Sequence, residues 1–141
     1  MMPGPSTISR YEIKRELGAG GMGILYLALD PLIDRLVAVK RLRVDTEEMR
    51  ARFLREARAS GRLQHKNIVT TFDVGVDDDQ PFIAMEYIKG ETLAEVIRRK
   101  APLALERKLK LMEELCDGLG YAHDEGLIHR DIKPDNLMVT E

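Results

Sequence analysis

The order of residue patterns along the 141-residue sequence predicts an α+β fold. Segments with the patterns of β-strands, interrupted by one helical segment, extend to about residue 86. Only helical patterns follow Gly90. We therefore expect a disordered leader at residues 1–10, rich in Pro, Gly and Ser. A small sheet-rich lobe at 11–86, a link at 87–90 and the beginning of a helical lobe at 91–141 are expected to follow.

Five segments of the first lobe have strand patterns. In residues 11–17 apolar and charged residues alternate, as they do in a strand that has one buried face. The other four segments are apolar runs bounded by turn residues. The five predicted strands lie at residues 11–17, 24–29, 36–42, 68–76 and 81–88.

Three helices are predicted. An amphipathic helix is expected within residues 46–63, because apolar residues recur there at every fourth position between charged residues. Thr92 and Glu95 have the spacing of a capping box, which predicts the start of a short helix. A long helix is expected from about residue 105 to residue 125. The apolar residues that mark the first and third helices are Met49, Phe53 and Ala57, and Leu105, Leu109, Met112, Cys116 and Leu119.

The composition excludes several classes of protein. Hydrophobic residues make up 44% of the chain and charged residues 33%, as in a globular protein rather than a disordered one. The net charge of −2 gives no reason to expect nucleic acid or an anionic membrane as a partner. Cys116 is the only cysteine, which rules out an internal disulfide and is typical of a reducing compartment.

No targeting or membrane signal is recognisable in the sequence. The first nine residues lack the basic region and the apolar core of a signal peptide. The longest uncharged run, LGAGGMGILYLAL, has 13 residues, whereas a helix needs about 20 to span a bilayer. We expect a cytoplasmic chain without membrane contact of its own, although a longer parent protein could carry an anchor.

A glycine-rich stretch, GAGGMG, lies between the first two predicted strands. Glycines allow a backbone to approach phosphate oxygens closely and to point N–H groups at them. A dinucleotide-binding turn would require a helix directly after the glycines, and a Walker loop would require Lys followed by Ser or Thr. A strand pattern beginning with Ile24-Leu25 follows instead. A flexible hairpin and a hairpin that covers phosphates therefore both remain open.

Lys40 ends the apolar run VAVK in the third predicted strand. It is either a solvated strand residue, as most lysines are, or an ammonium group that points into a cleft beside the glycine hairpin. In a cleft the ammonium would need a partner, for which Glu56 in the first predicted helix is a candidate. Alternatively, Glu56 pairs with Arg52 or Arg55 on the surface of the same helix.

The most specific set of polar side chains lies near the end of the sequence, in HRDIKPDN. Asp131 could accept a proton from a hydroxyl group or orient it, and Lys133 could neutralise phosphate charge. Asn136 offers an amide oxygen to a hard cation such as Mg²⁺. Each residue alone is ordinary in a turn, but the combination is hard to explain as unrelated turn residues.

Together these motifs resemble those of the protein kinase family. The G-x-G-x-x-G stretch, VAVK and HRDIKPDN occur here in the family's order, over nearly the whole chain from about residue 11 onward. The stretches RFLREARASGRLQHKNIV and YAHDEGLIHRDIKPDNLMV are most similar to the bacterial eukaryotic-like serine/threonine kinases. Lys133, two residues after Asp131, resembles the serine/threonine branch. The resemblance implies the N-terminal part of a protein-kinase-like fold, with a five-stranded antiparallel sheet in the first lobe.

The resemblance also implies a serine/threonine protein kinase that uses ATP and Mg²⁺ and acts on proteins. Lys40 would hold the α- and β-phosphates of ATP and pair with Glu56. Asp131 would act as the catalytic base, Lys133 would contact the γ-phosphate and the substrate, and Asn136 would be a magnesium ligand.

The implied ATP site combines the glycine-rich stretch with the end of the fifth strand. The glycines would cover the phosphates, Met85 would be the gatekeeper, and the backbone of Glu86 and Ile88 would bind the adenine edge. Leu17, Leu25 and Ala38 would wall the adenine pocket, Leu25 standing where the family usually has Val. The full set of implied ATP-binding residues is Leu17, Gly18, Ala19, Gly20, Gly21, Met22, Gly23, Leu25, Ala38, Lys40, Met85, Glu86 and Ile88.

The family's next motif, DFG, does not occur in this sequence. The Asp of that motif holds magnesium against the phosphates, so we expect this truncated chain alone to have negligible activity. The long helix would lack helices to pack against, and an exposed apolar side would favour self-association. The alternative is a non-catalytic nucleotide-binding or regulatory fragment that acts through protein contacts. A dinucleotide-dependent oxidoreductase is disfavoured, because no strand–glycine–helix unit is predicted.

Overall fold

The computed structural model describes most of the chain as two compact units. The described residues are 6–20, 23–43, 46–127 and 134–140, with the backbone alone for Glu56 and Asp135. The first unit is Met1–Arg62 with Thr70–Tyr87, and the second is Leu63–Val69 with Ile88–Glu141. The second unit thus includes a short segment that lies, in sequence, between two parts of the first.

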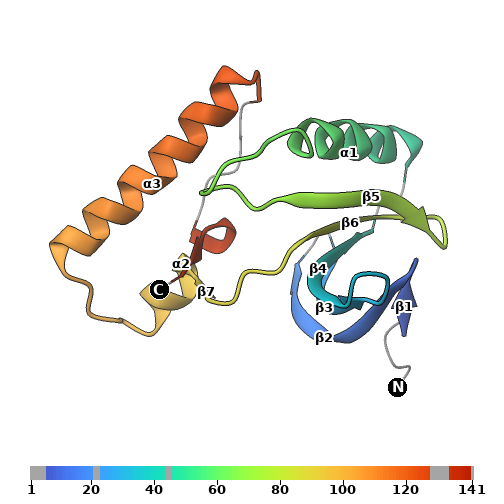
Figure 1. The fold of residues 1–141 in the computed structure, drawn as a ribbon, viewed down its shortest axis with the longest axis horizontal. Helices are drawn as coiled ribbons and strands as arrows, with labels where there is room; N and C mark the ends of the chain where they lie inside the picture. The colour runs from blue at the N-terminus through green and yellow to red at the C-terminus, as the bar shows by residue number, and fades with distance from the viewer. Residues whose placement is uncertain (1–5, 21–22, 44–45, 128–133, 141) are drawn as a thin grey trace. The chain divides into compact units, whose positions relative to one another are not determined.

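The first unit is built on one antiparallel sheet, in which the described residues form six strands in the order β1-β2-β3-β4-β6-β5 (Figure 1). The strands are β1 (Thr7–Ile8), β2 (Tyr11–Gly20), β3 (Gly23–Asp30), β4 (Arg35–Leu42), β5 (Thr71–Asp77) and β6 (Gln80–Glu86). The sheet therefore has one strand more than expected, because β1 forms within the predicted leader. The side chain of Ile8 is fully buried, and this burial stabilises β1. A single apolar residue gives no periodicity from which a strand could be predicted.

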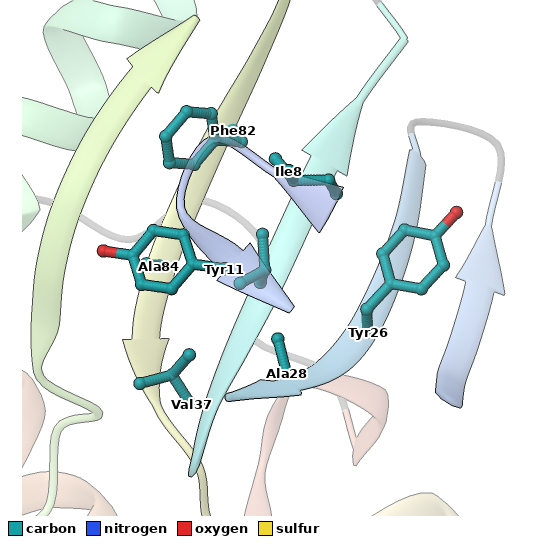
Figure 2. Close-up of a cluster of buried hydrophobic side chains, with 8 residues drawn as sticks. Ile8, Tyr11, Tyr26, Ala28, Val37, Phe82 and Ala84 are labelled. Carbon is teal, nitrogen blue, oxygen red and sulfur yellow. The ribbon is translucent and has the colours of Figure 1, made fainter. Parts of the chain in front are cut away.

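Alternate residues of the strands lie on opposite faces of this sheet. On one side, which we call the core face, Tyr26, Val39 and Ala84 are aligned across β3, β4 and β6 and are all buried. Tyr11 and Phe82 pack edge to face there, with ring centroids 6.1 Å apart. Figure 2 shows this cluster, which consists of Ile8, Tyr11, Tyr26, Ala28, Val37, Val39, Phe82 and Ala84.

A polar cluster joins the turn after β1 to strands β2, β3 and β5. Arg10 donates two hydrogen bonds to the carboxylate of Asp30, from Nε at 3.2 Å and from Nη2 at 3.0 Å. The hydroxyl of Tyr11 donates to the carboxylate of Asp73 at 3.0 Å. Burial, together with this hydrogen bond, raises the pKa of Tyr11 to about 12. The hydrogen bonds from Arg10 lower the pKa of Asp30, which is 2% exposed.

Helix α1 (Glu47–Ser60) confirms the amphipathic helix predicted from the sequence, and it lies beside β5 (Figure 1). The Oγ1 atom of Thr46 accepts a hydrogen bond from the N–H of Met49 at 3.1 Å and so caps the start of the helix. Arg50 donates a hydrogen bond to the backbone oxygen of Asp79 in the turn between β5 and β6. Both central residues of that turn have positive φ, as a two-residue type I′ hairpin requires.

The second unit contains two helices and a short sheet. Its elements are β7 (Glu91–Thr92), α2 (Leu93–Arg98), α3 (Leu105–Asp124), the 3₁₀ turn η1 (Pro134–Asn136) and β8 (Met138–Val139), with β7 and β8 antiparallel. The predicted capping box opens α2, since Thr92 Oγ1 accepts from the N–H of Glu95 at 3.1 Å and the Glu95 carboxylate accepts from the N–H of Thr92 at 3.5 Å. The N–H of Leu93 donates to the oxygen of Leu137 at 2.8 Å, which joins α2 to η1 and β8.

The segment Leu63–Val69 packs on α3 within the second unit. The ring of His65 lies 5.3 Å from the ring of Tyr121, and its Nδ1 accepts a hydrogen bond from the N–H of Asn67 at 3.0 Å. The Nδ2 of Asn67 in turn donates to Glu114 at 3.3 Å. Side chains of α3 therefore hold this segment, and β5 begins three residues later than the sequence predicts.

Helix α3 confirms the long helix predicted from the sequence. The apolar side chains that predicted it are largely uncovered, since Leu105, Leu109 and Met112 are 70%, 60% and 52% exposed. Gly118 and Ala122 are buried on another side of the helix. One side of the helix is therefore apolar and exposed, while another is buried. Neither α3 nor any other helix among the described residues has the length and apolar character that crossing a membrane requires.

Candidate functional site

Strands β2 and β3 form a hairpin with the glycine-rich stretch at its tip. Gly18 pairs with Leu25 across the hairpin, and Gly20 pairs with Gly23. The register shifts by one residue just before Gly18, so Leu17 forms a β-bulge at the base of the glycine stretch. A strand follows the glycines directly, as the sequence predicts. This geometry differs from the strand–turn–helix unit that binds dinucleotides.

Gly18 and Gly23 of this glycine-rich stretch differ in the space that surrounds them. A Cβ added to Gly18 would have no atom within 4 Å, whereas a Cβ added to Gly23 would lie 2.2 Å from the backbone oxygen of Arg41 on β4. Gly23 is therefore required by the close approach of two strands, which the spacing of the glycines alone does not reveal. Gly21 and Met22 lie outside the described residues.

Lys40 lies on β4, level with Leu25 and Gly18 of the hairpin. It pairs with Leu25 on β3 and with Ile83 on β6. Leu25 in turn pairs with Gly18, so a row of aligned residues crosses β2, β3, β4 and β6. Paired residues of an antiparallel sheet project on the same face, which is here the face opposite the core. The side chain of Lys40 is exposed, and that of Glu56 lies outside what the structure describes, so their ion pair stays a prediction.

A second row lies two residues further along β4. Ala38 pairs with Leu27 on β3 and with Met85 on β6. Ala38 is buried, and its two partners are half-buried. Because Ala38 carries only a methyl group, the row forms a low apolar surface next to Lys40.

The end of β6 is held by contacts of Glu86. Its carboxylate accepts a hydrogen bond from the N–H of Thr70 at 3.2 Å, and its own N–H donates to the oxygen of Thr70 at 2.8 Å. No motif in the sequence predicts this side-chain contact. Ile88 follows two residues later and belongs to the second unit.

The predicted catalytic stretch is described only at its end. Asp131 and Lys133 lie outside the described residues. Asn136 is the last residue of η1 and is exposed. The roles predicted for these three residues therefore stay predictions.

Two residues of the aligned rows were not predicted as site residues. Leu27 and Ile83 share the face of Lys40 and flank the residues that were predicted. In the apolar runs 24–29 and 81–88, every second residue lies on the same face of the sheet. This alternation does not say which of the two faces carries the site. Only the pairing register resolves this.

The family model described as protein kinase domain matches residues 11–141. The chain is 42% identical over 142 residues to the serine/threonine-protein kinase PrkC of Bacillus subtilis, with 99% of this chain and 22% of PrkC covered. It is 38% identical over 147 residues to the serine/threonine-protein kinase PknB of Mycobacterium tuberculosis, with 99% of this chain and 24% of PknB covered.

Solved structures give a similar result. The crystal structure of the PknI kinase domain of Mycobacterium tuberculosis matches with a TM-score of 0.84 and 34% identity, covering 95% of this chain and 56% of that chain. A mutant of the same domain matches with a TM-score of 0.87, covering 99% of this chain and 59% of that chain. The chain thus spans less than a quarter of PrkC and PknB, and a little more than half of the solved kinase domain.

Proposed function

Because the chain belongs to the protein kinase domain family, we propose that it carries the ATP-binding lobe and the catalytic loop of a serine/threonine protein kinase. The reaction is transfer of the γ-phosphoryl group of ATP to a Ser or Thr hydroxyl of a protein. The row of aligned residues that joins Lys40 to Gly18 is the observation that supports this best. It brings a cation and a backbone that can approach phosphates to the same face of one sheet.

The described residues fit ATP in two respects. Gly18 has open space where a side chain would otherwise stand, so a phosphate could approach its backbone. The apolar row at Ala38 lies next to Lys40 and offers a surface to a purine ring. The other residues that we propose for this site are Leu17, Ala19, Gly20, Gly21, Met22, Gly23, Leu25, Met85, Glu86 and Ile88.

Each proposed catalytic residue has one task. Lys40 binds the phosphates of ATP and is paired with Glu56. Asp131 orients the substrate hydroxyl and accepts its proton, while Lys133 neutralises charge on the transferred group. Asn136 is proposed to hold Mg²⁺, which supplies further charge neutralisation when bound and accepts amide oxygens as ligands. Within the described part of the chain, no three His, Cys, Asp or Glu side chains gather into a metal site.

A thermal melt with and without MgATP tests the nucleotide site. The chain contains no Trp, so a dye should report unfolding. We expect MgATP to raise the melting temperature, because a ligand at 100 times its Kd adds about 2.7 kcal/mol of stability. Lys40→Met should lose most of this rise, whereas Lys14→Met, at an exposed position on β2, should keep it. An equal rise in all three chains, or no rise in any, contradicts the proposal.

We further propose that the 141-residue chain alone transfers phosphate at a negligible rate. Phosphoryl transfer depends on positioning and on charge neutralisation by metal and cations, and the sequence lacks the DFG motif that supplies the main metal ligand in the family. Incorporation of labelled phosphate into a Ser/Thr-containing protein, compared with that of Asp131→Asn, measures this. Robust transfer that depends on Asp131 would refute it.

A second candidate function is non-catalytic and acts through protein contacts. The exposed side chains of Leu105, Leu109 and Met112 on α3 favour it, and we propose that they mediate self-association. Sedimentation velocity should show a concentration-dependent dimer that Leu109→Lys abolishes and Lys110→Gln, at an exposed position beside it, retains. A monomer at every concentration contradicts this proposal.

We also propose a cytoplasmic location, supported by the free and exposed thiol of Cys116. The net charge of −2 supports the further proposal that nucleic acid is not a partner and that the chain makes no membrane contact through a basic surface. Fractionation of the source cells, with the chain followed by antibody, tests this location. Recovery of the chain with the membranes would contradict it.

A further inference from the structure

A cavity of about 270 Å³ lies at the glycine end of the first unit's sheet. Its wall is formed by residues of β3, β4, the start of β6 and the segment just after β4, among them Gly23, Ile24, Tyr26, Arg41, Arg43 and Gln80. Ile24 pairs with Arg41, and Tyr26 pairs with Val39, so these side chains lie on the core face. The cavity is therefore on the side of the sheet opposite Lys40.

The charged groups that the described residues bring to the cavity wall are Arg41 and Arg43, both cationic. Among the described residues, Arg41 makes one ion pair, with Asp78 at 3.8 Å, and the side chain of Asp78 is 91% exposed. Such exposed pairs contribute little, so Arg41 remains able to bind another anion. Arg43 is exposed and has no ion pair with any residue that the structure describes. No acidic side chain among the described residues lines the cavity.

The remaining wall combines apolar surface with a hydroxyl group. Ile24 packs at the edge of the core cluster, and the ring of Tyr26 is buried in it. Figure 2 shows that the hydroxyl of Tyr26 points away from the other side chains of the cluster. Over the described ranges of the chain, this hydroxyl has no hydrogen-bond partner. It is therefore available to donate to a ligand in the cavity.

We propose that this cavity binds a small phosphate monoester that carries an apolar group, such as an aryl phosphate. Guanidinium groups bind phosphate oxygens through paired hydrogen bonds, and two of them match the double charge of a phosphate monoester better than the single charge of a carboxylate. The hydroxyl of Tyr26 donates a further hydrogen bond, and the apolar group lies against Ile24 and the ring of Tyr26. The volume is close to the lower end of the range for ligand pockets, about 300–1,000 Å³, which restricts the ligand to a small one.

An NMR titration of the full 141-residue chain with phenyl phosphate tests the proposal. The backbone amides of Gly23, Ile24 and Gln80 should shift and saturate. Inorganic phosphate should bind more weakly, because it lacks the apolar group, and phenol should not bind, because it lacks the charge. Phenol binding as tightly as phenyl phosphate, or no saturable shift at these amides, overturns the proposal.

Variants separate this cavity from the proposed nucleotide site. Arg43→Gln is expected to weaken phenyl phosphate binding about tenfold, and Arg41→Gln at least as much, as the loss of a charge-assisted hydrogen bond implies. Arg35→Gln, at the other end of β4 where the guanidinium lies 3.8 Å from the ring centroid of Phe72, should leave the affinity unchanged. Arg43 is exposed, so Arg43→Gln should leave the fold intact. It therefore tests the cavity even if Arg41→Gln disturbs the fold.

Lys40→Met should also leave this affinity unchanged, since Lys40 lies on the other face. Binding that disappears in Lys40→Met would assign the ligand to the nucleotide site and overturn the proposal. The chain could bind phenyl phosphate while its melting temperature shows no response to MgATP. This result would support the ligand site in the cavity and contradict the proposed kinase function.

Discussion

The two faces of the sheet in the first unit are made by alternate residues of the same strands, yet they differ in burial and in chemistry. On the core face, Tyr26, Val39 and Phe82 are buried and pack against one another. On the opposite face, Leu25 is half-buried and Lys40 is exposed. A strand can therefore separate scaffold from site with a spacing of one residue. Changes in the buried cluster of the core face should lower stability, and changes on the opposite face should lower binding at the proposed nucleotide site.

Removing a large core-face side chain should lower the stability of the chain most strongly. Phe82 is 3% exposed, and its ring fills the space beside Gly75, where an added Cβ would lie 2.9 Å from it. Phe82→Ala should lower the free energy of unfolding by about 3–5 kcal/mol, because a cavity replaces the ring. Urea denaturation measures this. Ile83→Ala, at the next residue on the opposite face, is the matched control and should cost clearly less; equal losses would contradict the division between the faces.

The glycine hairpin offers a second test, because Gly18 and Gly23 belong to one motif but are constrained differently. Gly23→Ala should destabilise the chain by about 1–3 kcal/mol, since its Cβ would meet the backbone oxygen of Arg41 at 2.2 Å. Gly18→Ala should change stability by less than about 0.5 kcal/mol, because nothing lies within 4 Å of its Cβ position. Thermal melts without ligand measure both effects. If the two substitutions destabilise equally, the strand contact is not what requires Gly23.

The same pair of variants sharpens the proposal for the nucleotide site. Gly18→Ala should weaken MgATP binding although its stability is unchanged, because the methyl group occupies the space open to a phosphate. Unchanged binding would argue against phosphates at this hairpin.

A smaller effect is expected where the core face ends in polar groups. Tyr11→Phe keeps the ring that packs on Phe82 but removes the hydroxyl that donates to Asp73. It should cost about 1 kcal/mol, the net contribution of one such hydrogen bond. A double-mutant cycle with Asp73→Ala checks the assignment, since the loss caused by Asp73→Ala should shrink in the Tyr11→Phe chain. Simple additivity would show that the hydrogen bond contributes nothing.

The smallest effect at neutral pH is expected for Asp30→Asn. The single oxygen of Asn can still accept from the Nε of Arg10 and from the N–H of Leu32. The bond from Nη2 of Arg10 is lost, but Arg10 is partly exposed, so water can replace it. The pH dependence is more informative. Because the pKa of Asp30 is lower in the folded chain than its usual 3.8, its contribution to stability is present above about pH 4 and is lost as the pH falls through the folded value.

Melting temperatures from pH 7 down to pH 2 measure this contribution of Asp30. The original chain should lose more stability on acidification than Asp30→Asn, so their melting temperatures should converge at the lowest pH. Parallel curves would show that Arg10 does not favour the charged form of Asp30.

Much of the fold could be predicted because short patterns in the sequence indicate individual strands and helices. The alternation in residues 11–17 and the apolar runs correspond to β2, β3, β4, β5 and β6, and the capping box at Thr92 opens α2 where expected. Several features departed from prediction because distant residues determine them. The expectation of helices alone after Gly90 was wrong, since β7 and β8 pair there as short strands far apart in sequence. Strand β1 depends on the burial of Ile8, and Leu63–Val69 is held by side chains of α3. Neither contact leaves a periodic pattern in the chain.

Residue types at fixed spacings were enough to predict the family and the order of the main strands and helices, and they give the residues that we propose for the chemistry. The tertiary structure decided which residues share a face. It aligned Gly18, Leu25 and Lys40 in one row, set Arg41 and Tyr26 on the other side, and required Gly23 for a contact between strands. The physical reason is that a strand alternates its side chains with a period of two. The pairing register, set by bulges and turns far apart in sequence, determines how those alternations line up across the sheet.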